Sequence, residues 1–247
     1  MKKRLNESME IHDELNPKLW QDSESLRPEV KEALLKIKEV FIENTELPIN
    51  IIATHLVGSN VSYNYTPYSD LDLHFVVNFD SIPAPKELVQ AYYNGERSAF
   101  NKAHDISIHG VNVEVYVEDV NAGTMSNGIY HLETDTWIKR PNKITGIQVY
   151  DTTELVDDWK YRINVALNSS DLDSVQKCID ALYLMRKNSI ASEGEYGMGN
   201  QVFKDIRNLG LLDNLKKVRD KLISQRLTLE SFTENYYLGD MFRMNLD

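Results

Sequence analysis

The sequence of 247 residues contains a single cysteine, Cys178. One cysteine cannot close a disulfide within the chain or supply a cysteine-based zinc site, so both are excluded. Long apolar runs are also missing, and none approaches the roughly 20 residues of a membrane-spanning helix. The first residues, Met1-Lys2-Lys3-Arg4, are basic but no apolar segment follows them, unlike a secretory signal. We therefore expect a cytoplasmic protein with no membrane partner.

Positive charge is scarce as well. The 27 Lys and Arg residues face 38 Asp and Glu residues, which gives a formal net charge of −11. A protein that holds nucleic acid mainly through its phosphates normally shows the opposite balance. We therefore expect no extended nucleic-acid surface, and a substrate that is small or held by a local basic patch. The apolar content of 42% is ordinary for a globular chain, long enough for one large or two small domains.

Two neighbouring stretches carry the most specific pattern. The apolar run Ile49 to Val57 predicts a buried strand that ends at Gly58-Ser59. A loop follows, and then a run with two alternating faces, apolar at Leu71, Leu73 and Phe75 and polar at Asp70, Asp72 and His74. A strand repeats every two residues, so Asp70 and Asp72 point the same way, with Cα atoms roughly 6.5–7 Å apart.

Two carboxylates on one side of a strand repel each other and are costly to desolvate. A divalent cation between them removes both problems, and oxygen ligands suit Mg²⁺ or Mn²⁺. A third acidic residue, Glu114, lies on a later alternating run whose valines face the other way. Beside the first carboxylate strand, Glu114 would complete a three-carboxylate, two-metal site. The alternative is an Asp-x-Asp pair on a solvated strand face without function.

The combination of Val57-Gly58-Ser59, Asp70-Leu71-Asp72 and Glu114 resembles the signature of the DNA polymerase β-like nucleotidyltransferase superfamily. The resemblance covers roughly residues 45 to 120. It implies that Asp70, Asp72 and Glu114 are the catalytic and metal-binding residues. It also implies that Gly58 and Ser59 hold the phosphates of a nucleotide. Glu114 stands where the family more often has Asp, and its longer side chain still reaches a metal.

The resemblance implies an α+β fold, in which a small mixed or antiparallel sheet is flanked by helices and followed by a C-terminal helical bundle. We expect an N-terminal extension and helix packed on the catalytic domain (1–44), the nucleotidyltransferase catalytic domain (45–150) and a C-terminal helical domain closing the cleft (151–247). Hydrophobic periodicity predicts helices over residues 28–44, 85–102, 155–167, 172–187, 202–209, 211–223 and 229–238. It also predicts a hairpin over 105–119 and edge strands over 128–132 and 137–141.

The implied function is a metal-dependent nucleotidyl transfer. An NMP would move from an NTP, with ATP as the first expectation, to a hydroxyl acceptor, with release of pyrophosphate and with Mg²⁺ or Mn²⁺ as cofactor. Ser69, Lys187 and Lys204 are further candidates for nucleotide binding. The acceptor stays open among a small molecule, a protein and an RNA 3′ end. Two alternatives also stay open: a catalytically silent nucleotide-binding module of a complex, and a metal-dependent phosphohydrolase.

The loop between the two strands holds Tyr63, Tyr65 and Tyr68. Three tyrosines beside a phosphate site suggest two uses. Their rings would either stack on a nucleotide base or anchor the loop to the domain.

Overall fold

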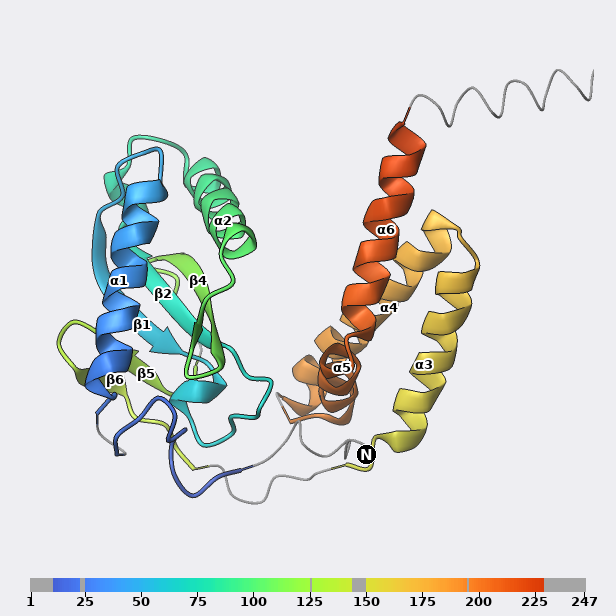
Figure 1. Ribbon diagram of the computed structural model, residues 1–247, viewed down its shortest axis with the longest axis horizontal. Coiled ribbons are helices and arrows are strands. Elements are labelled where there is room, and N and C mark those ends of the chain that lie inside the picture. The colour runs from blue at the N-terminus through green and yellow to red at the C-terminus, as the bar shows by residue number, and fades with distance from the viewer. Residues whose placement is uncertain (1–10, 23–24, 125, 144–149, 195, 229–247) are drawn as a thin grey trace, which may run out of the picture. The chain divides into compact units, whose positions relative to one another are not determined.

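The computed structural model describes residues 11–22, 25–124, 126–143, 150–194 and 196–228. The chain divides into two compact units, one within residues 9–146 and the other within residues 147–247. Each unit is described by itself below (Figure 1). The helix predicted over residues 229–238 lies outside the described residues. In the described ranges, no helix is both long and apolar enough to cross a bilayer.

The first unit is built on a mixed six-stranded sheet with the strand order β3-β4-β2-β1-β5-β6. Its strands are β1 (Ile51–Val57), β2 (Leu71–Val77), β3 (Ser107–Ile108), β4 (Val111–Asp119), β5 (Ile129–His131) and β6 (Thr136–Lys139). β2 lies between an antiparallel β1 and a parallel β4. The predicted hairpin over 105–119 is confirmed, since β3 and β4 pair antiparallel.

Two helices cover one face of this sheet (Figure 1): α1 (Pro28–Asn44) and α2 (Lys86–Ala103). α1 begins with Pro28, whose missing N–H is not needed in the first turn. Its apolar stripe ends in Phe41, whose ring lies 5.0 Å from that of Phe75 on β2 and 5.2 Å from that of Phe100 on α2. The helices predicted over 28–44 and 85–102 are therefore confirmed, and they share one core with the sheet.

The prediction of two edge strands near residue 130 is half wrong. β6 is an edge strand, but β5 lies inside the sheet, between β1 and β6. The reason is its central residue, Tyr130, which is fully buried. Its ring meets Trp20 of the N-terminal segment at 5.0 Å and Trp137 of β6 at 5.0 Å. This aromatic cluster binds the N-terminal segment to the sheet, a long-range contact that the local pattern does not reveal.

The second unit consists, in its described residues, of α3 (Thr153–Asn168), α4 (Leu172–Glu193), α5 (Met198–Asn208) and α6 (Leu211–Leu227). The four helices surround their own apolar core, with Ile163, Ile179, Phe203 and Leu215 among its members. α4 runs six residues beyond the predicted end and stops at Gly194, whose φ of 78° breaks the helix. That this part of the chain closes a cleft over the carboxylates stays a prediction.

Candidate functional site

The parallel pairing of β2 with β4 brings two of the predicted carboxylates together. Asp72 stands directly opposite Glu114 in the register. Neighbouring strands lie about 4.8 Å apart, so both side chains leave the same face of the sheet side by side. The apolar partners Leu71 and Leu73 are fully buried on the other face. The predicted neighbourhood of the two strands is confirmed, while the catalytic and metal-binding roles stay predictions.

Asp70 and Glu114 open onto one cavity of about 250 Å³. The cavity lies where the C-terminal end of α2 passes β3 and the start of β4. Beyond the two carboxylates, its walls come from Asn101, Lys102, His104, Asp105, Ile106, Asn112 and Val113. All three predicted carboxylates therefore belong to one corner of the first unit, since Asp72 is the strand partner of Glu114.

The three carboxylates lie in one corner of the unit but do not form a ready metal site. In the described residues, no group of three or more His, Cys, Asp or Glu side chains is arranged to hold a metal ion. The type of donor still fits, because carboxylate oxygens are the ligands that Mg²⁺ and Mn²⁺ prefer. Asp70, Asp72 and Glu114 are the residues that would hold such ions.

Gly58 touches the second carboxylate. Its backbone has φ 85° and ψ −168°, a conformation that side chains rarely adopt. A Cβ atom at this position would lie 2.2 Å from Oδ2 of Asp72, closer than any non-bonded contact allows. The glycine of the predicted Gly-Ser pair is therefore required twice, by its backbone conformation and by the carboxylate beside it.

The loop between β1 and β2 is held by internal hydrogen bonds. Ser59 Oγ donates to Ser69 Oγ at 2.7 Å, and the Ser69 hydroxyl also accepts from the N–H of Thr66. The buried side chain of Asn60 donates to the carbonyls of Ser69 and Asp70, each at 2.9 Å. Asn60 thus fixes the backbone that carries the first carboxylate. The sequence analysis missed this residue, although it directly follows the Gly-Ser pair.

The backbone N–H of Gly58, a predicted phosphate donor, already has a partner. It donates to Ser126 Oγ at 3.3 Å. The carbonyl of Ser126 in turn accepts from Nζ of Lys139 at 2.6 Å. A phosphate oxygen that used this N–H would take the place of the Ser126 hydroxyl. Ser126 lies in a segment without hydrophobic periodicity, so no sequence pattern marks it.

Two of the loop tyrosines serve as anchors in this structure. Tyr65 stacks on His12 with ring centroids 3.8 Å apart and planes 12° from parallel. Tyr63 packs against the main core, and its carbonyl accepts the N–H of His12. Between the two uses predicted for these rings, the structure supports anchoring to the N-terminal segment.

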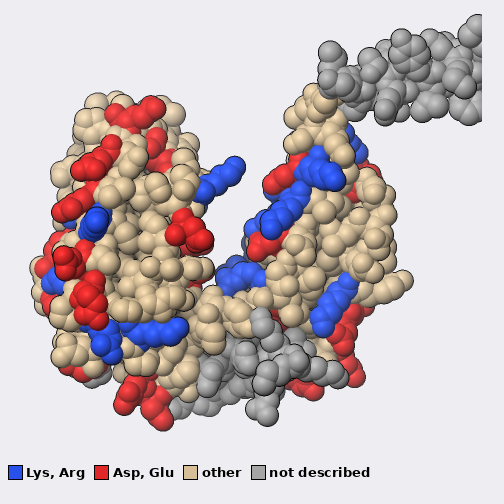
Figure 2. Space-filling view, viewed as in Figure 1, with Lys and Arg blue, Asp and Glu red and all other residues tan. Residues whose placement is uncertain are grey.

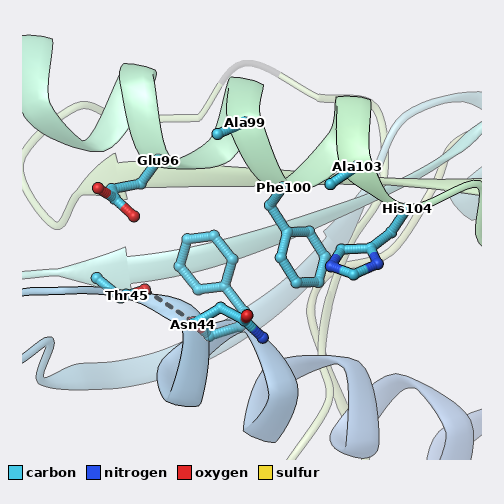
Figure 3. A pocket seen from close by; sticks show the side chains of 8 residues that line it. Asn44, Thr45, Glu96, Ala99, Phe100, Ala103 and His104 are labelled. Atoms are coloured by element: carbon cyan, nitrogen blue, oxygen red, sulfur yellow. Dashed lines mark hydrogen bonds between the residues drawn. The ribbon is translucent and has the colours of Figure 1, made fainter.

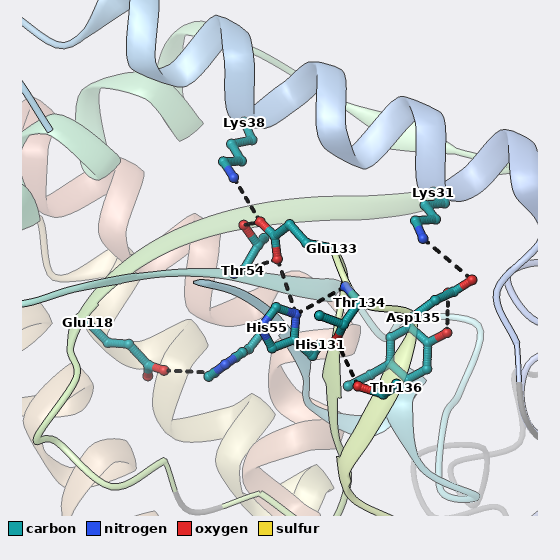
Figure 4. Close-up of polar contacts among 11 residues, drawn as sticks. Lys31, Lys38, Thr54, His55, Glu118, His131, Glu133, Thr134, Asp135 and Thr136 are labelled. Carbon is teal, nitrogen blue, oxygen red and sulfur yellow. Dashed lines mark hydrogen bonds and ion pairs between the residues drawn. The ribbon is translucent and has the colours of Figure 1, made fainter. Parts of the chain in front are cut away.

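A row of imidazoles crosses the polar face next to the carboxylates. The register places His131 of β5 opposite His55 of β1, and His55 opposite His74 of β2. Both oxygens of Glu118 are used: one lies 3.7 Å from Nδ1 of His55, and the other lies 2.9 Å from Nδ1 of His74 (Figure 4 shows the former contact). Burial by itself would raise the pKa of Glu118, but these imidazoles and the Thr124 hydroxyl hold it well below its usual range.

A second carboxylate in Figure 4 joins three elements. Glu133 accepts from Nζ of Lys38 on α1 at 2.7 Å and from the N–H of Thr54 on β1 at 3.0 Å. It lies two residues after the end of β5, so it ties that strand to its neighbours. Burial opposes the charge, but these donors lower the pKa of Glu133 to about 2.

The predicted lysines belong to the second unit. Lys187 is exposed on α4, and Lys204 is partly buried on α5. Their role as phosphate ligands stays a prediction. On the face that Figure 2 shows, acidic side chains are spread over the first unit and basic ones lie along α6.

A second cavity of about 170 Å³ lies between the C-terminal end of α1 and the C-terminal half of α2 (Figure 3). Its lining includes the aromatic side chains of Phe41 and Phe100 and the polar side chains of Glu96 and His104. It is on the side of the sheet that the helices cover. None of its lining residues belongs to the predicted site.

Comparison with known proteins adds little to this geometry. No protein-family model matches the sequence, and no curated protein matches it. A search of solved structures matched a STING-associated CdnE c-di-GMP synthase from Capnocytophaga granulosa at 11% identity, over 82% of this chain and 84% of that one. The TM-score is 0.24. A similarity of this size is too weak to indicate a function for this chain.

Proposed function

We propose that the protein is a metal-dependent nucleotidyltransferase of the polymerase β-like type. It would move an NMP from an NTP, ATP first among them, to a hydroxyl acceptor and release pyrophosphate. The observation that carries this proposal is the corner where Asp72 and Glu114 are register partners and the backbone of Gly58 lies against the Asp72 carboxylate. The resemblance of the Gly-Ser and Asp-x-Asp motifs to that superfamily supports it.

Each residue has a distinct role in this proposal. Asp70, Asp72 and Glu114 would hold Mg²⁺ or Mn²⁺, which would supply charge neutralisation and a lower pKa for the acceptor hydroxyl. Glu114 would also accept the proton of that hydroxyl. Gly58 and Ser59 would hold the phosphates and thereby orient the NTP for in-line attack.

A second candidate is a silent nucleotide-binding module. One observation favours it: the three carboxylates are not gathered in the described residues. Such a module would bind an NTP without turning it over.

The test is turnover of α-labelled NTPs by the purified protein with Mg²⁺ or Mn²⁺. Each NTP is supplied alone and together with small-molecule, protein and RNA fractions. The Asp70→Asn/Asp72→Asn variant removes two charges from the site at constant volume. Asp80→Asn is the matched control, because Asp80 is exposed and its carboxylate contacts the exposed residues Lys86 and Asn121.

The proposal expects label on an acceptor with the parent and with Asp80→Asn, and none with the double variant. Binding of NTP without transfer would favour the silent module. Release of labelled NMP or NDP without transfer would instead indicate a phosphohydrolase. Equal transfer by the parent and the double variant would overturn the assignment of the site.

A further inference from the structure

The carboxylate of Glu114 is held by a neighbour on its own strand. Tyr116 lies two residues further along β4, hence on the same face, and its hydroxyl donates to Oε2 of Glu114 at 2.6 Å. A carboxylate offers about four acceptor sites on its two oxygens. One bond from a phenol therefore restrains the orientation of the group and leaves acceptor sites on its oxygens for a further partner.

The ring of Tyr116 is held in turn from the helix side. The guanidinium carbon of Arg97, on α2, lies 4.7 Å from the ring centroid, the arrangement of a cation–π contact. On the neighbouring strand β2, the ring centroid of His74 lies 4.9 Å from that of Tyr116. The ring of Tyr116 thus has a defined partner on α2 and another on β2.

The guanidinium of Arg97 combines this ring contact with a buried N–H group. Its Nε is buried, and it has no hydrogen-bond partner among the described residues. A buried donor without a partner destabilises the folded state. The cation–π contact with the ring of Tyr116 offsets part of this cost.

The register of α2 against β4 is also fixed close by. One turn after Arg97, the side chain of Asn101 donates to the carbonyl of Val115 at 2.9 Å and accepts the Val115 N–H at 3.0 Å. The amide thus continues the ladder of the sheet at the open edge of β4. Val115 is the residue between Glu114 and Tyr116. This pair of bonds therefore holds α2 beside the contacts that run from Arg97 through Tyr116 to Glu114, which we call the relay.

We propose that Arg97 and Tyr116 are positioning residues for Glu114, which they hold in the orientation that binds a divalent metal ion. The inference rests on the proposed function, since it assigns Glu114 as a metal ligand. Residues that hydrogen-bond to metal ligands typically change metal affinity about 10–100-fold when they are altered. Arg97 and Tyr116 act through Glu114 and need no contact with the substrate.

The test is the affinity for Mn²⁺, measured by electron paramagnetic resonance of the free ion, without any turnover. Tyr116→Phe removes only the hydroxyl and leaves the ring for Arg97, and Arg97→Met removes the charge but keeps an apolar stem. Tyr130→Phe is the matched control, because the buried Tyr130 also donates its hydroxyl to a carboxylate, that of Asp135. Circular dichroism confirms that each variant is folded.

We expect Tyr116→Phe to weaken Mn²⁺ binding about tenfold or more, Arg97→Met to weaken it severalfold, and Tyr130→Phe to change it less than twofold. Parent-like affinity in both relay variants would overturn the inference while the metal site itself stands. An equal loss in Tyr130→Phe would overturn it too, because the effect would then be general destabilisation. If the parent binds no Mn²⁺, with or without NTP, the metal-dependent function fails and the relay with it.

Discussion

At the scale of the residue, the site depends on how closely Gly58 approaches Asp72. Two separate constraints act there, the positive φ of 85° and the missing space for a Cβ atom. They can be distinguished by experiment, because Gly194 has nearly the same backbone, φ 78° and ψ −168°, with nothing within 4 Å of an added Cβ.

We predict that Gly58→Ala and Gly194→Ala both destabilise the fold by about 1–3 kcal/mol from backbone strain. Only Gly58→Ala displaces the Asp72 carboxylate, so only that variant should also lose Mn²⁺ binding and NTP turnover. Thermal unfolding together with Mn²⁺ titration measures both effects. Equal metal affinity in the two variants would show that the contact with Asp72 does not matter.

The alternation of residues 70–75 and 111–117 was sufficient to predict that Asp70, Asp72 and Glu114 lie on the polar faces of their strands. The same local pattern could not reveal Asn60, Ser126 or Arg97. Their contacts join positions on separate elements, such as the backbone of Gly58 and Ser126, and pattern reasoning along one strand has no access to such pairs.

At the scale of the element, Glu133 links α1, β1 and the turn after β5. Its pKa falls from 4.5 to about 2 on folding. A lowered pKa stabilises the fold above the unfolded value, and this contribution is lost as the pH falls from about 5 toward 2. After allowance for partial exposure of the carboxylate, it amounts to roughly 2 kcal/mol.

We therefore predict that Glu133→Gln lowers the free energy of unfolding at pH 7 by roughly 2 kcal/mol. Between pH 5 and pH 2, the variant should lose less stability than the parent. Glu39→Gln, an exposed position on the same helix as Lys38, is the control. Urea unfolding at a series of pH values measures both. A parent-like acid profile in Glu133→Gln would contradict the role assigned to this carboxylate.

A second prediction at this scale concerns the contact between α2 and the edge of β4. Asn101→Ala leaves the N–H and the carbonyl of Val115 without their partner, which should cost about 1–3 kcal/mol. Hydrogen exchange at the Val115 amide should become faster than in the parent. Asn94→Ala, exposed on the same helix, should not change it. Unchanged exchange in Asn101→Ala would show that these two bonds contribute nothing.

The elements themselves follow closely from hydrophobic periodicity. α1 coincides with its predicted range, and α2 differs by one residue at each end. The interior place of β5 was missed because burial of Tyr130 comes from Trp20, about 110 positions away in the chain. Strand order is a long-range property, and a short run such as Ile129–His131 contains no information about its second neighbour.

At the scale of the whole molecule, the predicted carboxylates belong to one compact unit, and Lys187 and Lys204, which the sequence suggests as nucleotide-binding residues, belong to the other. If both lysines bind the triphosphate, Lys187→Met and Lys204→Met should each raise the KM for NTP about tenfold, or about 1.4 kcal/mol, with little change in kcat. Lys177→Met, also on α4, is the control. Steady-state kinetics that show a parent-like KM in both variants would remove these lysines from the site.

The most direct measurement is anomalous scattering from crystals grown with Mn²⁺ and a non-hydrolysable NTP. The account predicts at least one Mn²⁺ peak within about 2.0–2.3 Å of carboxylate oxygens of both Asp72 and Glu114, with the phosphates beside Gly58 and Ser59. Bound nucleotide with Mn²⁺ absent from these carboxylates, or held only by other residues, would contradict the account.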